Sequence, residues 1–295
     1  MSDPTSQWIS LRGPELCVDI DPLGAQLSVL RDRDGRDLLW DGNPSVWSGR
    51  APLLFPIVGA LAGGHYHVDA RSYPLARHGF ARGRRFEVLS ADSAAATFRL
   101  AADEATLRVY PFRFELTVDF ALHESTLSIT TRVRNRGDVG MPASFGYHPA
   151  FRWPLPYGHE RSDHFIEFTT DEPGPMRRLD AAGLLTPVRH VTPIRGRRLA
   201  LADALFQDDV MIFDEVASRS VTYGAASGPR IRVGYPGSTF LGIWAKPGAA
   251  FVCIEPWRGV ADPVGFDGDF STKPGVFLVA PGVEVPIEMT ISLLP

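Results

Sequence analysis

Two residues of this sequence combine acid–base chemistry with a stiff backbone setting. His148 and Glu255 each end a run of apolar, strand-like residues and are followed at once by proline, as Tyr147-His148-Pro149 and Ile254-Glu255-Pro256. Proline restricts the preceding residue to extended backbone and cannot donate to a sheet ladder, so we expect both side chains at strand ends. An imidazole and a carboxylate held in this way suit a reaction that removes one proton from a small polar substrate and delivers another.

Both residues also have a plain structural interpretation. Glu255 could be a carboxylate at the rim of a sheet, paired with Arg258, and His148 could be a half-buried histidine bonded to a backbone carbonyl. However, a carboxylate that follows the apolar run 251–254 is costly unless something uses or neutralises it. Trp257 beside it offers a flat apolar face on which a sugar ring could stack. These neighbours favour a functional role for the pair.

Three further polar residues could orient a polyhydroxylated substrate. His78 and Arg82 lie in the segment Arg77–Arg82, and Asp209 precedes the strand-like run 210–213. An arginine can donate a fork of hydrogen bonds to substrate oxygens, although Arg82 could equally be one of many surface arginines. Asp209 could accept from sugar hydroxyls, whereas two adjacent acids before a strand are more often a solvated turn.

Alternate histidines at His65-Tyr66-His67 raise the question of a metal site. Such histidines point the same way on a strand, as metal ligands do in cupin-like barrels. A cupin motif needs a glutamate soon afterwards, and Val68–Arg77 contains none, so we expect no metal there. The sequence also lacks a phosphate-binding loop, a dinucleotide fingerprint and a nucleophile-elbow serine, which excludes the usual nucleotide-binding and serine-hydrolase classes.

The elements that must position these residues are short β-strands. Residues 126–133 alternate apolar and polar side chains, and together with residues 114–122 and the turn 123–125 they predict an antiparallel hairpin. Helical periodicity is nearly absent, and glycine and proline lie mostly between the strand-like runs. The expected strands are residues 16–20, 26–30, 86–89, 97–100, 114–122, 126–133, 210–213, 231–233, 240–244, 251–254 and 285–291.

This pattern predicts an all-β protein, a bent sandwich of large antiparallel sheets in a single domain over residues 1–295. A net charge of −4 with scattered arginines argues against nucleic-acid binding. Without a signal sequence or an apolar run long enough to cross a membrane, we expect a cytoplasmic protein, as monomer or homodimer. Cys17 and Cys253 lie in apolar segments and imply no disulfide framework.

Four blocks of the sequence, taken in order, resemble a known family. They are Pro52–Gly59, Arg77–Arg82, Phe145–Phe151 with Asn135 upstream, and Glu255–Gly259. Together they are similar to the aldose 1-epimerase (galactose mutarotase-like) superfamily over nearly the whole chain. The resemblance implies a β-supersandwich fold, a cleft that takes a hexose, interconversion of α and β anomers, and no metal or organic cofactor.

The resemblance also implies roles for individual residues. Glu255 looks like the general base of the family, His148 like its general acid, and His78 like the second histidine of the active site, which binds the substrate. Arg82 and Asp209 match substrate-binding positions. Trp257 belongs to the same block as Glu255.

One departure from the family pattern concerns the substrate. Relatives commonly carry an arginine after the Phe-Pro-x-x-Gly block, where this chain has Ala60, so Arg50 or Arg82 would have to take over its contacts. Two alternatives to a plain hexose epimerase stay open. One is a sugar-binding or regulatory protein without turnover, and the other is an epimerase for phosphorylated or modified sugars, served by a basic cluster of Arg77, Arg82, Arg84 and Arg85.

Overall fold

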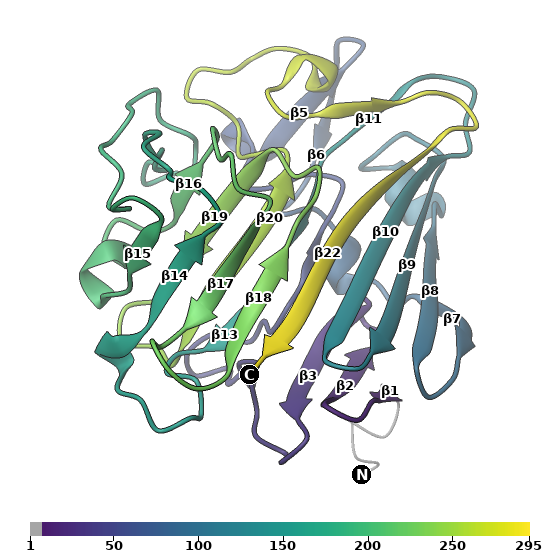
Figure 1. Ribbon diagram of the computed structural model, residues 1–295. Coiled ribbons are helices and arrows are strands. Elements are labelled where there is room, and N and C mark those ends of the chain that lie inside the picture. The colour runs from purple at the N-terminus through teal and green to yellow at the C-terminus, as the bar shows by residue number, and fades with distance from the viewer. Residues whose placement is uncertain (1–7) are drawn as a thin grey trace.

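Antiparallel β-sheets are the main regular secondary structure of the protein (Figure 1). The computed structural model describes residues 8–295. Among these residues the only α-helix is α1 (Glu104–Leu107), accompanied by short 3-10 turns. The predicted all-β class is therefore confirmed. The 3-10 turns are η2 (Ala62–Gly64), η3 (Ala81–Gly83), η4 (Arg161–Asp163), η5 (Asp203–Phe206) and η6 (Phe270–Thr272).

The largest sheet has nine strands and contains the predicted hairpin. β9 and β10 pair along their whole length across a two-residue turn, with His123 opposite Thr126. Their side chains alternate between buried and partly exposed, as the sequence pattern predicts. The order across this sheet is β15 (Arg198–Ala200), β14 (Phe165–Phe168), β17 (Ser220–Gly224), β18 (Arg230–Gly234), β22 (Glu284–Leu294), β10 (Thr126–Asn135), β9 (Phe114–His123), β8 (Ala95–Ala101) and β7 (Glu87–Ala91).

A second sheet of six strands carries the residues of interest. Its order is β16 (Met211–Phe213), β19 (Phe240–Trp244), β20 (Phe251–Arg258), β12 (Phe145–Tyr147) and β4 (Leu53–Leu54), with β13 (Ala150–Arg152) also paired to β20. One large apolar core joins this sheet to the nine-stranded one. The Tyr147 hydroxyl crosses that core and donates to the Ile287 carbonyl oxygen at 2.8 Å. The residue that precedes His148 is thereby fixed to the opposite sheet.

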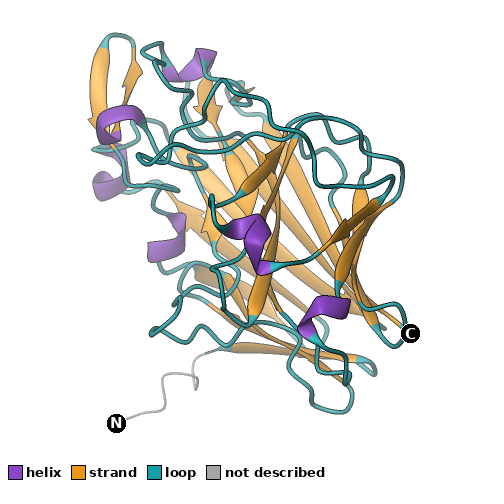
Figure 2. Cartoon of the chain, turned by 90° about the vertical axis from the view of Figure 1, so that its left-hand side faces the viewer, coloured by secondary structure: helices purple, strands orange, loops and turns teal. Residues whose placement is uncertain are grey.

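Smaller sheets complete the fold. β1 (Ile9–Arg12), β2 (Leu16–Asp21) and β3 (Gln26–Asp32) form a three-stranded sheet, and two strand pairs join β5 (His65–Val68) to β6 (Arg71–Pro74) and β11 (Met141–Ala143) to β21 (Phe277–Val279). Figure 2 shows loops and short helical turns in front of the strands. Within residues 8–295 no helix is long and apolar enough to span a membrane, and both cysteines are free.

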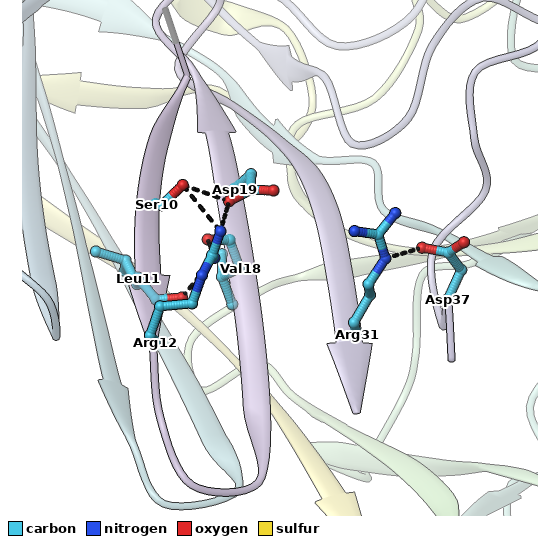
Figure 3. A network of polar contacts seen from close by, with 7 residues as sticks. All are labelled: Ser10, Leu11, Arg12, Val18, Asp19, Arg31 and Asp37. Carbon is cyan, nitrogen blue, oxygen red and sulfur yellow. Dashed lines mark hydrogen bonds and ion pairs between the residues drawn. The ribbon is translucent and has the colours of Figure 1, made fainter. Parts of the chain in front are cut away.

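The three-stranded sheet carries an ordinary surface network (Figure 3). Arg12 forms an ion pair with Asp19 at 2.7 Å and also donates to the Val18 carbonyl oxygen. Arg31 pairs with Asp37 at 2.6 Å. Exposed pairs of this kind stabilise a protein by about 1 kcal/mol or less, so they help the edge strands without determining the fold.

Candidate active site

A pocket of about 410 Å³ opens over the six-stranded sheet, a size that suits a monosaccharide. All six residues singled out from the sequence line it, although they come from distant parts of the chain. The lining residues are Trp47, Pro52, Val58, Gly59, Arg77, His78, Arg82, His148, Leu179, Asp209, Val210, Ile212, Trp244, Glu255, Trp257 and Ala261.

The sheet register explains why His148 and Glu255 meet. β20 pairs with β12 at Gly146–Trp257 and with β13 at Ala150–Cys253. Both ladders share one register, so His148, in the gap between β12 and β13, falls opposite Glu255. Opposite residues of an antiparallel pair point to the same face of the sheet. The two side chains are therefore delivered to one side, and His148 Nε2 lies 3.1 Å from Glu255 Oε2.

One expectation about this region is wrong. His148 does follow the end of a strand, but Glu255 lies inside β20, which continues through Pro256 to Arg258. The reason is the gap between β12 and β13. Pro256 falls opposite Tyr147, the last residue of β12, one step beyond the final pairing of β12 with β20 at Gly146–Trp257, so no pairing with β12 or β13 requires the N–H that proline lacks.

Burial controls the protonation of the pair. Desolvation raises the pKa of the Glu255 carboxyl well above its ordinary value, and the nearby charge of Asp209 acts in the same direction. Desolvation lowers the pKa of the His148 imidazole to about 3. In the empty pocket the neutral pair, a carboxylic acid beside a bare imidazole, is therefore favoured over the ionised pair.

His78 is held as a neutral hydrogen-bond donor. The ring Nδ1 of His78 accepts from the Gly59 N–H at 3.1 Å, and the backbone N–H of His78 donates to the Gly59 carbonyl oxygen at 2.9 Å. Because Nδ1 is an acceptor, the ring proton must be on Nε2. Desolvation, followed by the neighbouring His148, lowers the pKa of His78 well below its ordinary value and keeps the ring uncharged.

Three tryptophans are the largest apolar side chains that line the pocket. Trp47 stacks on the His148 ring with 5.2 Å between ring centroids, and Trp244 meets the same ring edge to face at 5.9 Å. Trp257 lies against two glycines of neighbouring strands, where an added Cβ would come within 2.6 Å of its ring at Gly146 and 2.5 Å at Gly242. Sequence reasoning found Trp257 and missed Trp47 and Trp244, because nothing in their local sequence points to His148.

Charged side chains line one side of the pocket. Arg82 donates to the Arg77 carbonyl oxygen at 2.9 Å, and the Arg77 guanidinium lies 4.0 Å from the Asp209 carboxylate. Asp209 has a left-handed backbone, with φ of 63°. Arg178, which the sequence reasoning did not single out, is buried and donates to the Asp209 carbonyl oxygen at 2.6 Å. It holds the loop that brings Asp209 to the pocket.

Arg50 does not replace the arginine that relatives carry at the position of Ala60. Ala60 is absent from the described lining of the pocket, and so is Arg50, whose guanidinium donates to the Ser28 carbonyl oxygen at 2.7 Å. Of the two arginines proposed as substitutes, only Arg82 lines the pocket. Arg77 joins it there, whereas Arg84 of the basic cluster pairs with Asp103 at 3.4 Å.

A buried ion pair lies next to Ala261, a residue that lines the pocket. Lys273 Nζ lies 2.8 Å from Asp262 Oδ1, and both side chains are almost inaccessible. Asp262 Oδ2 accepts from the Ala62 N–H, and the Asp262 N–H donates to the Ala60 carbonyl oxygen. This contact ties the segment after Gly59 to the residues that follow β20, and so supports the loop that orients His78.

Solved structures with the same architecture are galactose mutarotase-like proteins. The galactose mutarotase related enzyme from Lactobacillus acidophilus superimposes with a TM-score of 0.91 at 30% identity, covering 98% of this chain and 97% of that one. A galactose mutarotase-like protein from Lactobacillus casei ATCC 334 gives 0.88 at 26% identity, covering 97% and 100%. The fold is thus the galactose mutarotase-like β-supersandwich predicted from the sequence blocks.

Sequence comparison then identifies the family. Residues 7–272 match the family described as aldose 1-epimerase. Protein LacX (plasmid) of Lactococcus lactis subsp. lactis is 30% identical over 283 residues, 92% of this chain and 95% of LacX. A putative glucose-6-phosphate 1-epimerase of Cenchrus ciliaris is 28% identical over 162 residues, 48% and 46% of the two chains. The chain belongs to the aldose 1-epimerase family.

Proposed function

We propose that this protein is an aldose 1-epimerase that interconverts the α and β anomers of a hexose by general acid–base catalysis. The observation that carries the proposal is the contact of 3.1 Å between His148 Nε2 and Glu255 Oε2 in a pocket of about 410 Å³. Because the acid and the base lie so near one another, both can reach the hemiacetal centre of one pyranose ring. No metal or organic cofactor is needed for this chemistry.

The proposed reaction opens and recloses the sugar ring. Glu255 removes the proton of the anomeric hydroxyl while protonated His148 delivers a proton to the ring oxygen, so that the bond between C1 and the ring oxygen breaks and a free aldehyde forms. Rotation about the C1–C2 bond presents the other face of the aldehyde, and the same two groups act in reverse during closure. His78, held as an Nε2–H donor by Gly59, would hydrogen-bond a substrate oxygen.

This reaction requires the ionised form of a pair that is neutral in the empty pocket. Moving one proton across the contact between His148 and Glu255 interconverts the two forms. Hydroxyl groups of a bound sugar would donate hydrogen bonds to the Glu255 carboxylate, which favours its charged form. We therefore propose that substrate binding, rather than the empty site, produces the imidazolium and carboxylate that the mechanism uses.

Polarimetry on freshly dissolved α-glucose and α-galactose tests the proposal. Replacing Glu255→Gln or His148→Asn should each slow the protein-dependent decay of optical rotation by about 10²–10⁴-fold. His164→Asn is a matched control, because His164 is a buried histidine whose ring Nε2 accepts from the Leu155 N–H and which does not line the pocket. Full turnover in either pocket variant, with a sugar that the wild type accepts, would refute the assignment.

Because Glu255 and His148 act as a unit, the rate losses caused by replacing each of them should not multiply. The double variant Glu255→Gln/His148→Asn is expected to turn over about as slowly as the worse single variant, rather than at the product of the two losses. Independent, multiplicative losses measured in the same assay would mean that the residues act in separate steps.

The pH profile of kcat/KM gives a further check. The active pair carries one proton in all, so activity falls at low pH when a second proton binds and at high pH when the shared proton leaves. Since burial lowers the pKa of His148 and raises that of Glu255, the active range should extend below the usual histidine pKa and well above the usual glutamate pKa. A profile whose alkaline limb follows an ordinary glutamate would contradict this.

A phosphorylated sugar is a second candidate substrate, favoured by Arg77 and Arg82 at the edge of the pocket. The printed name of the Cenchrus ciliaris relative points the same way. Saturation transfer between anomeric protons, measured by NMR, applies equally to glucose and glucose 6-phosphate. Faster exchange only for the phosphate ester would identify that class. Saccharide binding by calorimetry without faster exchange of any sugar would instead favour a non-catalytic binding protein.

A further inference from the structure

A third ligand-type side chain lies with the acid–base pair. Cys253 is two residues before Glu255 on β20, on the same face of the strand, and it pairs across the sheet with Ala150. The ligand atoms of His148, Cys253 and Glu255 all lie within 4.8 Å of one another. All three residues are more than nine-tenths buried. The proposed mechanism uses only two of them.

This cluster contains polar atoms that the rest of the protein leaves unsatisfied. Glu255 Oε2 and His148 Nδ1 are buried and have no hydrogen-bond partner within residues 8–295. The ring nitrogen that faces Glu255 Oε2, at 3.1 Å, is the other one, His148 Nε2. A buried acceptor without a donor costs free energy that a bound cation would recover. The cluster thus combines three ligand-type side chains with a buried carboxylate oxygen that has no hydrogen-bond partner within residues 8–295.

The donor set and spacing suit a zinc-type ion. Zinc binds nitrogen, sulfur and carboxylate oxygen at about 2.0–2.3 Å, which places tetrahedral ligand atoms about 3.3–3.6 Å apart. The nitrogen–oxygen contact of 3.1 Å is already near that length, and the sulfur must draw in by no more than about 1.5 Å. A thiolate and an imidazole disfavour calcium and magnesium, which prefer oxygen ligands.

We propose that His148, Cys253 and Glu255 form a binding site for one zinc-type divalent cation, and that occupancy of this site switches off turnover. His148 and Glu255 line the pocket that a sugar would fill, so an ion can reach them from there. A bound ion would occupy both proton-transfer groups and compete with substrate. The metal site stands without the proposed function, whereas its inhibitory effect rests on it.

Cobalt(II) tests the metal site without any measurement of catalysis. Chelator-treated protein titrated with Co²⁺ should show the near-ultraviolet sulfur-to-cobalt charge-transfer band and the visible bands of a tetrahedral ion, and added Zn²⁺ should bleach both. The variants Cys253→Ala and Cys253→Ser should lose the charge-transfer band and bind Zn²⁺ at least ~10-fold more weakly. Cys17→Ala, which removes the other cysteine of the chain, should behave as the wild type.

Two results would overturn the site. One is a wild-type protein that shows no sulfur-to-cobalt band at saturating Co²⁺, and the other is a Cys253 variant, folded by circular dichroism, that binds Zn²⁺ as tightly as the wild type. The two replacements guard against a folding defect in one of them, because alanine removes the side chain and serine keeps its size.

Inhibition is measured separately. Zn²⁺ should slow wild-type anomer exchange, sugar should relieve the inhibition, and Cys253→Ala should keep its metal-free turnover while resisting Zn²⁺. Equal sensitivity of Cys253→Ala and wild type would overturn the inhibitory role. If the protein has no epimerase activity, the cobalt spectrum still decides the metal site, so failure of the proposed function and failure of this inference can be told apart.

Discussion

The β9–β10 hairpin and strand β20 follow different rules, although both are central strands of the same sandwich. Along the hairpin, side chains alternate between buried and partly exposed at nearly every step. Along β20, every residue from Phe251 to Trp257 is buried, including a glutamate and a proline. The hairpin follows the alternation of buried and exposed residues that is usual in a sheet. β20 does not alternate, and it holds a buried glutamate and a proline where it lines the pocket. In this protein, departures from local consistency mark the site.

The same contrast appears in how charges are used. On the hairpin, Arg136 pairs with Glu115 at 2.7 Å on the surface, with about half of the arginine side chain exposed. Beside the pocket, Lys273 and Asp262 form their pair in the interior. Surface pairs can be lost at small cost, but a buried charge that loses its partner has nothing to replace it. The pocket side should therefore be the more fragile half of the molecule.

Lys273→Met should produce the largest loss of stability. It leaves Asp262 buried without its cation, so we expect the free energy of unfolding to fall by about 3–5 kcal/mol. Arg136→Met on the hairpin is the matched change and should cost about 1 kcal/mol or less. Urea denaturation of both variants measures the difference. Equal losses would remove the distinction between the two regions.

Gly59→Ala should produce the second largest loss of stability. Gly59 has φ of 77°, and an added Cβ would lie 2.5 Å from the Ala261 Cβ and 2.6 Å from its Cα. Left-handed backbone alone costs an alanine about 1–2 kcal/mol, and overpacking adds about 1–3 kcal/mol more. Because Gly59 also orients His78, anomer exchange should slow as well.

Gly64→Ala separates the backbone cost of Gly59→Ala from its packing cost. Gly64 has nearly the same φ, 75°, but within the described residues no atom lies closer than 4 Å to its added Cβ. It should lose only the backbone contribution and keep full activity. If thermal unfolding and polarimetry give the same result for both alanine variants, the packing around Gly59 does not support the site.

The smallest expected effect, that of Glu255→Gln, is a gain in stability rather than a loss. Glu255 has a raised pKa in the folded protein, so its protonated form contributes stability that is present at low pH and lost as the pH rises through the folded pKa. Glu255→Gln cannot ionise, so the unfolding free energy of the metal-free variant, relative to that of the wild type, should rise as the pH increases above the ordinary pKa of glutamate. Glu288→Gln, an exposed change on β22, should show no such gain.

Much of the fold could be predicted from the sequence, because the large sheets obey alternation. The hairpin was predicted with its ends within a residue or two, and the strand predicted at residues 240–244 matches β19 (Phe240–Trp244). The strands that were missed are short, such as β4 with two residues and β21 with three. Segments that brief show no period, and their neighbours in the sheet decide their conformation.

The candidate site was predicted in part for a similar reason. His148, Glu255 and His78 stand out because an ionisable residue in an apolar or glycine-flanked segment is unusual locally. Trp47, Trp244 and Arg178 do not stand out, since tryptophan and arginine are ordinary residues until the fold brings them to the pocket. The protonation of the pair also needed the structure, because only burial shows which form is favoured. The single-domain organisation and the roles of the site residues stay predictions.

The place of β22 has a consequence for how the protein is made. This strand, residues 284–294, pairs with β10 on one side and with β18 on the other, in the middle of the nine-stranded sheet. A ribosome releases these residues after the other eight strands of this sheet, so the two halves of the sheet must wait unjoined during synthesis. Their open edges are then exposed to other chains, which makes the nascent protein a natural client for a chaperone.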